Sequence, residues 1–372
     1  MELWPTKLMI NLIFFLPNFT FGGAGNSIVR LCKSLDNKKY KINIISIGKC
    51  AYKNELKNYG FIFYELKKIR LIYLIYVLQK IIKKIYSPKF SKTIFISGHH
   101  YANIISIISL FFINNIKLIL VERTDLEELK IYYNLKKFIK NRIIYFLIKI
   151  LYKKADLIVS NSKSGKKDLK ILCKGNVTNI TPPSFLGYEK IYKKKKQKTL
   201  RIVTVGRLVR EKGIKTMIKA IKKTNLKNIT LKILGNGSEK KYLNQLIAKL
   251  NLKNNIFLLG HIKNPKKIYL ESDLFIHASH FEGFPNSIVE AINYNLPVIC
   301  SDCKGGTKEI ILNGKGGDLF DVGDYKTLAK KIISFYKNPN ELKKKLKFSR
   351  QNIKKFSLEN NVQKYEFIFR TI

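Results

Sequence analysis

Short apolar runs of strand length alternate with longer segments of helical periodicity, and this alternation occurs twice along the chain. In the first half, the runs cover residues 7–16, 40–47, 93–97, 117–122 and 156–161. In the second half, they cover residues 200–205, 229–234, 256–259, 273–278 and 297–300. Strands that are apolar on both sides suit a parallel sheet with helices on both faces. The pattern therefore predicts an α/β fold made of two doubly wound, Rossmann-like domains.

The chain of 372 residues is longer than one ordinary hydrophobic core supports, and its apolar content of 46% is enough for two. A polar, Lys-rich segment at residues 193–198 separates the two alternating halves. We therefore expect domains at residues 1–190 and 199–355, followed by a helical segment at residues 356–372. Ligands of such sheets bind beyond the carboxyl ends of the strands, so we expect the two domains to face each other across a ligand cleft.

The formal net charge of +46 raises the question of nucleic-acid binding, because basic surfaces release counterions from phosphate backbones. Residues 1–190 carry 33 Lys and Arg against 11 Asp and Glu, and the rest of the chain carries 38 against 14. Only 9 of the 71 basic residues are Arg. This even excess of Lys indicates compositional drift rather than one binding surface, so we expect no nucleic-acid partner.

Five scattered cysteines are an odd number, which argues against a disulfide framework and favours a reducing, cytoplasmic location. Cys300 and Cys303 have C-x-x-C spacing, but no second pair accompanies them, so we interpret them as a strand end and its loop. The apolar run at residues 8–16 is too short to cross a bilayer, and the run at residues 103–121 is interrupted by two Asn and one Lys. We expect no transmembrane span.

Two stretches, residues 66–86 and 129–154, interleave Lys and Arg with Ile, Leu, Tyr and Phe at roughly helical spacing. Such helices can dock on an anionic membrane surface through a basic, aromatic face. They can equally bury one face in the core and expose a solvated Lys-rich face. The pattern leaves both interpretations open.

The segment EGFPNSIVE (282–290) sets two carboxylates eight residues apart, after an apolar run and before a helix. If Glu282 lies in the loop and Glu290 in the second helical turn, both can face one cleft. A carboxylate pair suits the hydroxyls of a sugar or ribose. Asn286 and Ser287 are good N-cap types, and the helix end that they would cap attracts anions.

Glycine and arginine stand at two other expected strand ends. GGAG (22–25) precedes a helix, where glycine lets the backbone approach an anionic ligand, although a tight turn without a ligand fits equally. GRLVREKG (206–213) offers Arg207 for bidentate phosphate contact and Lys212 as a point charge. A solvated cationic loop is the alternative interpretation.

Four motifs in chain order, GGAG (22–25), ADLIVSNS (155–162), GRLVREKG (206–213) and SHFEGFPNSIVEA (279–291), resemble the family-4 retaining glycosyltransferases of the GT-B fold. The resemblance implies an acceptor-binding first domain, a second domain that binds a nucleotide-sugar donor, and a last helix that returns to the first domain. It implies transfer of a hexose or N-acetylhexosamine, with UDP favoured, to a saccharide or lipid-linked acceptor in polysaccharide or glycolipid biosynthesis.

The same resemblance implies roles for individual residues. Glu282 would contact the donor sugar and Glu290 the ribose, while Arg207 and Lys212 would neutralise the diphosphate. Donor contacts are further implied for Gly22, Gly23, Gly206, His261, Ile262, Gly283, Phe284, Pro285 and Asn286.

Two histidines and one arginine follow expected strands of the first domain. The resemblance implies that His99 or His100 faces the donor sugar, and both are catalytic candidates. The alternative is one packed and one surface histidine. Arg123 would bind an acceptor phosphate or carboxylate, or else form a structural ion pair with Glu122 or Asp125.

We expect neither a metal nor a cofactor, because no D-x-D carboxylate pair occurs. The charge of the leaving diphosphate would be met by the two cations and by helix ends, and the phosphate itself would accept the acceptor's proton. Two other classes stay open, an epimerase or similar sugar-nucleotide enzyme and a basic lipid- or nucleic-acid-binding protein. The first requires acid and base groups around a C–H bond, and the second requires clustered charge with stacking aromatics.

Overall fold

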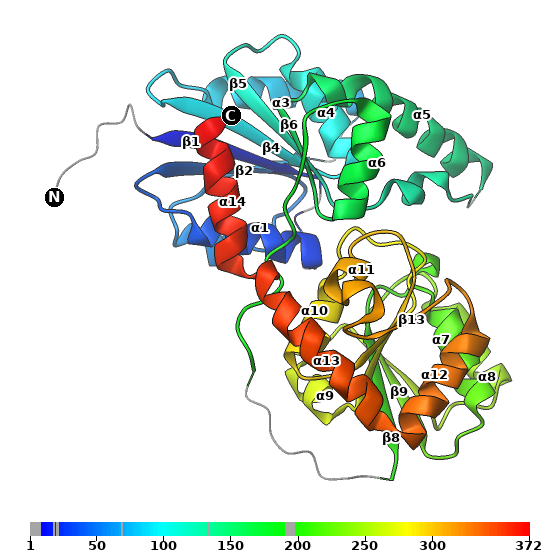
Figure 1. Cartoon of the computed structure of the whole chain (residues 1–372). Coiled ribbons are helices and arrows are strands. Elements are labelled where there is room, and N and C mark those ends of the chain that lie inside the picture. Colours follow the sequence, from blue (N-terminus) through cyan, green and yellow to red (C-terminus); the bar gives the residue numbers. More distant parts are fainter. Residues whose placement is uncertain (1–8, 18, 20–21, 68–69, 133, 190–197) are drawn as a thin grey trace. The chain divides into compact units, whose positions relative to one another are not determined.

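The computed structural model describes residues 9–17, 19, 22–67, 70–132, 134–189 and 198–372. It divides into two compact units, the first made of Met1–Pro183 and Leu358–Ile372 and the second of Ser184–Ser357 (Figure 1). Of the expected charged separator, residues 193–197 lie outside the described residues.

The first unit contains a seven-stranded parallel sheet in the order β3-β2-β1-β4-β5-β6-β7. Its strands are β1 (Ile10–Leu16), β2 (Tyr40–Ile47), β3 (Ile62–Leu66), β4 (Lys92–Gly98), β5 (Ile116–Glu122), β6 (Leu157–Ser160) and β7 (Val177–Asn179). The direction of strand order reverses between β1 and β4, which is the position where doubly wound sheets bind ligands.

Helices cover both faces of this sheet (Figure 1). They are α1 (Gly23–Ser34), α2 (Lys53–Lys57), α3 (Leu71–Ile85), α4 (His100–Leu110), α5 (Leu135–Leu151), α6 (Lys163–Cys173) and α14 (Leu358–Thr371). Leu12 and Phe14 pack in one apolar core, whereas Ile13 and Phe15 pack in the core on the opposite face. This two-sided burial is the physical reason for the uninterrupted apolar run in the sequence.

The second unit contains a six-stranded parallel sheet in the order β10-β9-β8-β11-β12-β13. Its strands are β8 (Leu200–Val205), β9 (Ile229–Leu234), β10 (Ile256–Gly260), β11 (Leu274–His277), β12 (Val298–Ser301) and β13 (Asp318–Phe320). Its helices are α7 (Ile214–Thr224), α8 (Lys240–Lys249), α9 (Lys266–Glu271), α10 (Asn286–Asn293), α11 (Thr307–Ile310), α12 (Tyr325–Lys337) and α13 (Pro339–Ile353). Here the order reverses between β8 and β11.

All ten strands expected from the sequence are present, and the α/β, doubly wound class is confirmed. Their ends fall within one residue of the expected bounds, except that the first strand begins at Ile10. Three strands were not expected, namely β3, β7 and β13, and each lies at an edge of its sheet. These three strands are only partly covered, so they lack the two-sided apolar pattern. In β3, for example, Ile62 is exposed.

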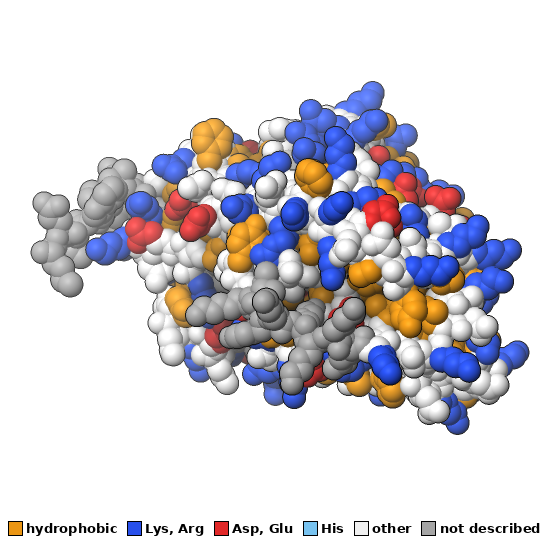
Figure 2. All heavy atoms as spheres, turned by 60° about the horizontal axis from the view of Figure 1, so that its bottom comes forward, with side chains coloured by type: hydrophobic (Ala, Val, Ile, Leu, Met, Phe, Trp, Pro, Cys, Tyr) orange, Lys and Arg blue, Asp and Glu red, His pale blue; other side chains and the backbone are white. Residues whose placement is uncertain are grey.

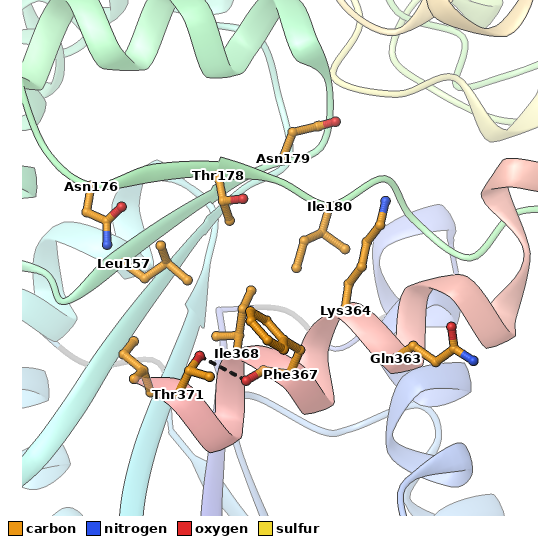
Figure 3. Close-up of a pocket in the computed structure, with 11 residues that line it drawn as sticks. Leu157, Asn176, Thr178, Asn179, Ile180, Gln363, Lys364, Phe367, Ile368 and Thr371 are labelled. Atoms are coloured by element: carbon orange, nitrogen blue, oxygen red, sulfur yellow. Dashed lines mark hydrogen bonds between the residues drawn. The ribbon is translucent and has the colours of Figure 1, made fainter.

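The last helix, α14, is part of the first unit, and its buried side chains enter the core beside α1. The rings of Phe369 and Tyr40 meet edge to face, with centroids 5.9 Å apart. Lys92 donates to the carbonyls of Arg370 at 3.2 Å and Ile372 at 2.7 Å, which caps the carboxyl end of the helix. A cavity of about 600 Å³ lies between α14 and the β6–β7 edge, and none of the predicted site residues lines it (Figure 3).

We expect Phe369→Ala to destabilise the first unit strongly, because Phe369 is fully buried. Truncating a buried Phe costs about 3–5 kcal/mol. Phe367 on the same helix is 65% exposed, so Phe367→Ala is the matched control and should leave stability nearly unchanged. Urea-induced unfolding of the full chain measures both, and equal unfolding midpoints would contradict the assigned packing of α14.

Candidate functional site

Most of the predicted site residues follow the carboxyl ends of the strands that flank each reversal of strand order, whereas Arg123 follows β5 and His261 and Ile262 follow β10. In the first unit, Gly22 and Gly23 follow β1, and His99 and His100 follow β4. In the second unit, the loop 206–213 follows β8 and the loop that carries Glu282 follows β11. Each unit therefore places its candidate residues where a parallel sheet binds ligands.

In the second unit, the Glu282 carboxylate is held by three side chains. Its Oε1 accepts a hydrogen bond from Ser279 at 2.7 Å, lies 2.9 Å from His277 Nε2, and forms an ion pair with Lys212. The Glu282 side chain is only 11% exposed. Because Lys212 comes from the loop after β8, the ion pair joins the two strands that flank the reversal.

These contacts determine the ionisation of Glu282. Burial by itself would raise the pKa of Glu282, but the charge of Lys212 and the contact with His277 outweigh it and hold the pKa well below its usual range. The carboxylate is therefore ionised at neutral pH and can only accept hydrogen bonds. It is a poor candidate for a general acid.

Two glycines allow neighbouring loops to approach the backbone of Glu282 and of Ala278 closely. Gly305 has φ +112°, and a Cβ at this position would come within 1.7 Å of the Glu282 carbonyl oxygen. Gly213 has φ +62°, and a Cβ there would come within 1.9 Å of the Ala278 carbonyl oxygen. Only glycine allows both the left-handed backbone and these close approaches.

Glu290 lies in the second turn of α10, as the spacing predicted, and accepts a hydrogen bond from Tyr269 Oη at 3.2 Å. The capping expectation was wrong, because the N-cap position is Pro285 and Asn286 is the first helical residue. Pro285 has φ −81° and ψ 87°, which lies outside the helical region, so the helix begins at the next residue. The Asn286 side chain instead accepts a hydrogen bond from Ser184 at 2.6 Å.

The two predicted diphosphate-binding cations have different surroundings. The Lys212 side chain is largely buried and pairs with Glu282. The Arg207 side chain is 70% exposed, and its Nη2 lies 3.6 Å from Glu211 Oε1. Gly206 continues the strand and donates to the Leu234 carbonyl at 2.9 Å. A ligand that approaches this loop therefore meets Arg207 first.

The remaining residues predicted to contact the donor divide into buried and exposed positions. The Gly283 carbonyl accepts a hydrogen bond from Gly306 N at 3.0 Å, and Phe284 is buried against Phe356. After β10, His261 is exposed and Ile262 is half-buried. Phe284 therefore packs under the loop that carries Glu282, whereas His261 lies at the surface.

In the first unit, Gly22 and Gly23 form the exposed start of α1, with Gly22 at the N-cap position. Gly22 N donates to Tyr52 Oη at 3.3 Å, and that hydroxyl donates to Asn26 at 2.6 Å. These contacts connect the glycine turn to Tyr52, the residue that precedes α2.

The two histidines after β4 differ sharply. His99 is exposed and has φ +90°, a backbone conformation that non-glycine residues rarely adopt and that is often found at functional sites. His100 is buried, with Nδ1 2.6 Å from Glu122 and Nε2 2.9 Å from Thr124 Oγ1. The sequence left the two histidines equivalent.

His100 and Glu122 form a buried pair in which each side chain favours the charged form of the other. Burial would lower the pKa of His100, but Glu122 outweighs it and raises that pKa. Burial would raise the pKa of Glu122, but His100 and Tyr152 outweigh it and lower that pKa. Asn103 also donates to Glu122 at 2.7 Å. The role of Glu122 as the partner of His100 was missed, because strand neighbours cannot be identified from one sequence.

Arg123 lies half-buried beside this pair and lines a small cavity with Ser27, Asn161 and Tyr365. Burial is the main cause that lowers the pKa of Arg123, against the opposing effects of Tyr365 and Glu122. The residues that line this cavity all belong to the first unit.

His277, Ser279 and Tyr269 were not selected from the sequence, although they hold the two glutamates. A histidine in an apolar strand is usually a packed core residue, so only the fold shows its contact with Glu282. All five cysteines are free and buried. In the part of the chain that the structure describes, no three His, Cys, Asp or Glu side chains come close enough to hold a metal ion.

Two Rossmann-like units in one chain are the architecture of the GT-B glycosyltransferases. The chain belongs to the family "Glycosyl transferases group 1", whose model matches residues 189–355. The resemblance drawn from the motifs is thereby confirmed at the level of fold and family. Membership of this family argues against the two alternatives that the sequence left open, an epimerase-like enzyme and a basic lipid- or nucleic-acid-binding protein.

Curated relatives support this assignment. The chain is 34% identical over 300 residues to an uncharacterised glycosyltransferase of Methanocaldococcus jannaschii, covering 74% of this chain and 72% of that protein. It is 33% identical over 231 residues to a Campylobacter jejuni enzyme, N-acetylgalactosamine-N,N'-diacetylbacillosaminyl-diphospho-undecaprenol 4-alpha-N-acetylgalactosaminyltransferase. That match covers 59% of this chain and 60% of the enzyme.

Solved structures share the fold. Anabaena HepE in complex with UDP-glucose has a TM-score of 0.79 at 18% identity, covering 97% of this chain and all of that one. Sucrose-phosphate synthase from Thermosynechococcus elongatus has a TM-score of 0.80 at 17% identity, covering 97% of this chain and 98% of that one.

Protonation of Glu282 should cost the protein stability. Because its pKa in the folded state lies below the unfolded value of about 4.3, its contribution is complete above that pH and is lost as the pH falls toward the folded pKa. We expect the free energy of unfolding of the wild type to fall on acidification by up to about 1.4 kcal/mol per pH unit more than that of Glu282→Gln.

Urea unfolding at neutral and acidic pH measures this difference. Glu341→Gln, at an exposed position of α13, is the control and should reproduce the wild-type pH dependence. If Glu282→Gln shows the same pH dependence as the wild type, the ion pair with Lys212 does not hold the carboxylate ionised.

Proposed function

We propose that this glycosyltransferase moves a hexose or N-acetylhexosamine from a UDP-sugar to a saccharide or lipid-linked acceptor, with retention and without a metal or cofactor. The observation that carries the proposal is the ionised Glu282, which is held by Lys212 at the reversal of strand order in the second unit. The proposed setting is polysaccharide or glycolipid biosynthesis in the cytoplasm. Free, buried cysteines are compatible with a reducing compartment.

The proposed role of Glu282 is to position the donor sugar. An ionised carboxylate accepts hydrogen bonds from sugar hydroxyls and has no proton to deliver. Glu290, one helical turn into α10, is proposed to hold the ribose hydroxyls in the same way. Both carboxylates are therefore binding groups, and neither serves as the acid or base.

The charge that develops on the leaving diphosphate needs stabilisation in the transition state. Arg207 is exposed in the loop after β8, and its planar fork suits a phosphate. Lys212 lies in the same loop immediately before α7, and the amino end of a helix favours anions. These groups supply positive charge from the chain itself, and we propose that the departing phosphate accepts the acceptor's proton.

The proposals of retention and of a UDP-linked donor rest on what the similar proteins are named for or were crystallised with. The Campylobacter enzyme is named for an alpha linkage, as are a poly(glycerol-phosphate) alpha-glucosyltransferase of Bacillus subtilis and a poly(ribitol-phosphate) alpha-N-acetylglucosaminyltransferase of Staphylococcus aureus. An alpha product from an alpha-configured nucleotide sugar requires retention. HepE was crystallised with UDP-glucose, which supports a UDP donor here.

The acceptor is proposed from the same comparison. The Campylobacter relative is named for an acceptor sugar carried on diphospho-undecaprenol, and two other relatives are named for polyol-phosphate polymers. These named acceptors all contain phosphate. Arg123, after β5 of the first unit, is proposed to meet such a phosphate or an acceptor carboxylate.

Of the two histidines, we propose that His99 faces the donor sugar. It is exposed at the reversal of the first sheet, at the amino end of α4, in a strained backbone conformation. His100 is buried against Glu122 and instead holds the strand ends together. The pair thus combines one ligand-facing residue with one positioning residue.

The two histidine variants should separate these roles. His99→Ala should lower turnover while the unfolding midpoint stays close to that of the wild type. His100→Ala removes one partner of a buried pair, which costs about 3–5 kcal/mol of stability. Thermal unfolding and initial rates measured on both variants test the assignment. A large loss of stability in His99→Ala with normal stability in His100→Ala would reverse it.

The donor is tested by calorimetric titration with UDP and GDP, followed by a panel of UDP-sugars. We expect UDP to bind, and Glu290→Gln to weaken its binding because the ribose loses one carboxylate oxygen that accepts its hydrogen bonds. Arg207→Ala should lower turnover about 10- to 100-fold, which corresponds to the usual free-energy contribution of one charge-assisted hydrogen bond.

Arg210→Ala is the control for Arg207→Ala, because both arginines are exposed in the same loop. It should keep wild-type turnover. Absence of binding to UDP-linked donors, or equal effects of the two arginine variants, would refute the proposed donor site.

A further inference from the structure

Helix α5 of the first unit has apolar side chains on two faces. One face packs in the core, where Ile148 is fully buried. The other face carries five large apolar side chains that are 39–64% exposed, namely Leu135, Ile139, Ile143, Phe146 and Ile150. An ordinary surface helix buries its apolar stripe and presents polar residues on the opposite side, so this second face needs an explanation.

The exposed residues form one continuous stripe. Their spacings of four, four, three and four residues place them above one another on the same side of a helix. The stripe therefore runs along most of the 17 residues of α5. In Figure 1, α5 lies at the outside of the helix layer of the first unit.

Positive charge accompanies the stripe. Five exposed basic residues lie on α5, namely Lys136, Lys137, Lys140, Arg142 and Lys149. No Asp or Glu occurs between residues 129 and 155. Long basic side chains beside an apolar face are typical of helices that lie in the interface of a membrane, with their charged ends at the headgroups.

We propose that α5 docks this protein on an anionic lipid surface, with the apolar stripe inserted at the boundary of the headgroups and acyl chains. A second copy of the chain fits this face less well, because self-association would bring two basic helices together. A nucleic acid fits it less well because four of the five stripe residues are aliphatic and offer no stacking surface. This inference does not depend on the proposed donor or acceptor.

The structure distinguishes α5 from the other candidate stretch, residues 66–86. That stretch begins at the end of β3, and α3 starts only at Leu71. The exposed apolar residues of α3 are confined to its first turns, from Leu71 to Tyr76, whereas Lys83 and Lys84 are exposed near its end. Helix α3 is therefore mainly an amphipathic helix with one buried face.

Basic charge by itself does not mark the docking face. Figure 2 shows Lys and Arg side chains scattered over the face that it presents rather than gathered in one patch. What distinguishes α5 is the coincidence of charge with a continuous exposed apolar stripe. In the described part of the chain, no helix is long and apolar enough to cross a bilayer.

The test is co-sedimentation of the full chain with vesicles of phosphatidylcholine alone or mixed with phosphatidylglycerol, at low and moderate salt. We expect binding to the anionic vesicles only, weakened by salt. The triple variant Lys136→Gln, Lys140→Gln, Arg142→Gln should lose about fivefold in partitioning for each charge removed. The triple variant Lys343→Gln, Lys344→Gln, Lys347→Gln carries the same change of charge on exposed positions of α13, and it should bind like the wild type.

A second pair of variants tests the apolar stripe. Ile139→Ser, Ile143→Ser, Phe146→Ser should abolish sedimentation, while Ile171→Ser, Leu186→Ser, Phe348→Ser removes comparably exposed apolar groups elsewhere and should not. Circular dichroism and size-exclusion chromatography accompany each variant. Failure of the wild type to bind anionic vesicles, equal losses in the control variants, or a wild-type dimer that only the α5 variants dissociate would overturn the proposal.

Discussion

Burial of both sheets on two faces constrains everything else in this molecule. Strands such as β1, whose residues alternate between two apolar cores, leave little room for polar side chains along their length. Most of the candidate functional groups therefore stand at the strand ends and in the loops that follow them. Where the order of parallel strands reverses, adjacent loops diverge to opposite sides and leave room for a ligand. Most of the candidate residues of each unit flank such a point.

Both units stabilise their strand ends in a similar way, with a buried or nearly buried carboxylate paired to a basic side chain that follows the neighbouring strand. In the first unit Glu122 pairs with His100, and in the second Glu282 pairs with Lys212. In each case the opposite charge outweighs burial and keeps the carboxylate ionised. The consequence differs, because the first pair is sealed from solvent, whereas the second belongs to the loop proposed to bind the donor.

The sequence predicted much of the fold because its strongest signal, two-sided apolar strands, reports burial directly. It missed β3, β7 and β13 because edge strands are covered incompletely and carry a weaker pattern. It placed Glu290 correctly on the second turn of α10 but assigned the wrong N-cap, since the start of the helix depends on Pro285. It could not identify His277 or Ser279 as partners of Glu282, because their contacts form only when loops meet in space.

The sequence by itself determined the two α/β domains, the order of the motifs and the family, because these depend on local periodicity and on residue types at short spacings. Only the tertiary structure shows that His99 is exposed and His100 buried, and that the exposed apolar stripe runs along α5 but covers only the first turns of α3. In both cases the sequence offers two chemically equivalent candidates. Their difference is which side chain the packing buries and which it leaves exposed, and burial is a property of the folded chain.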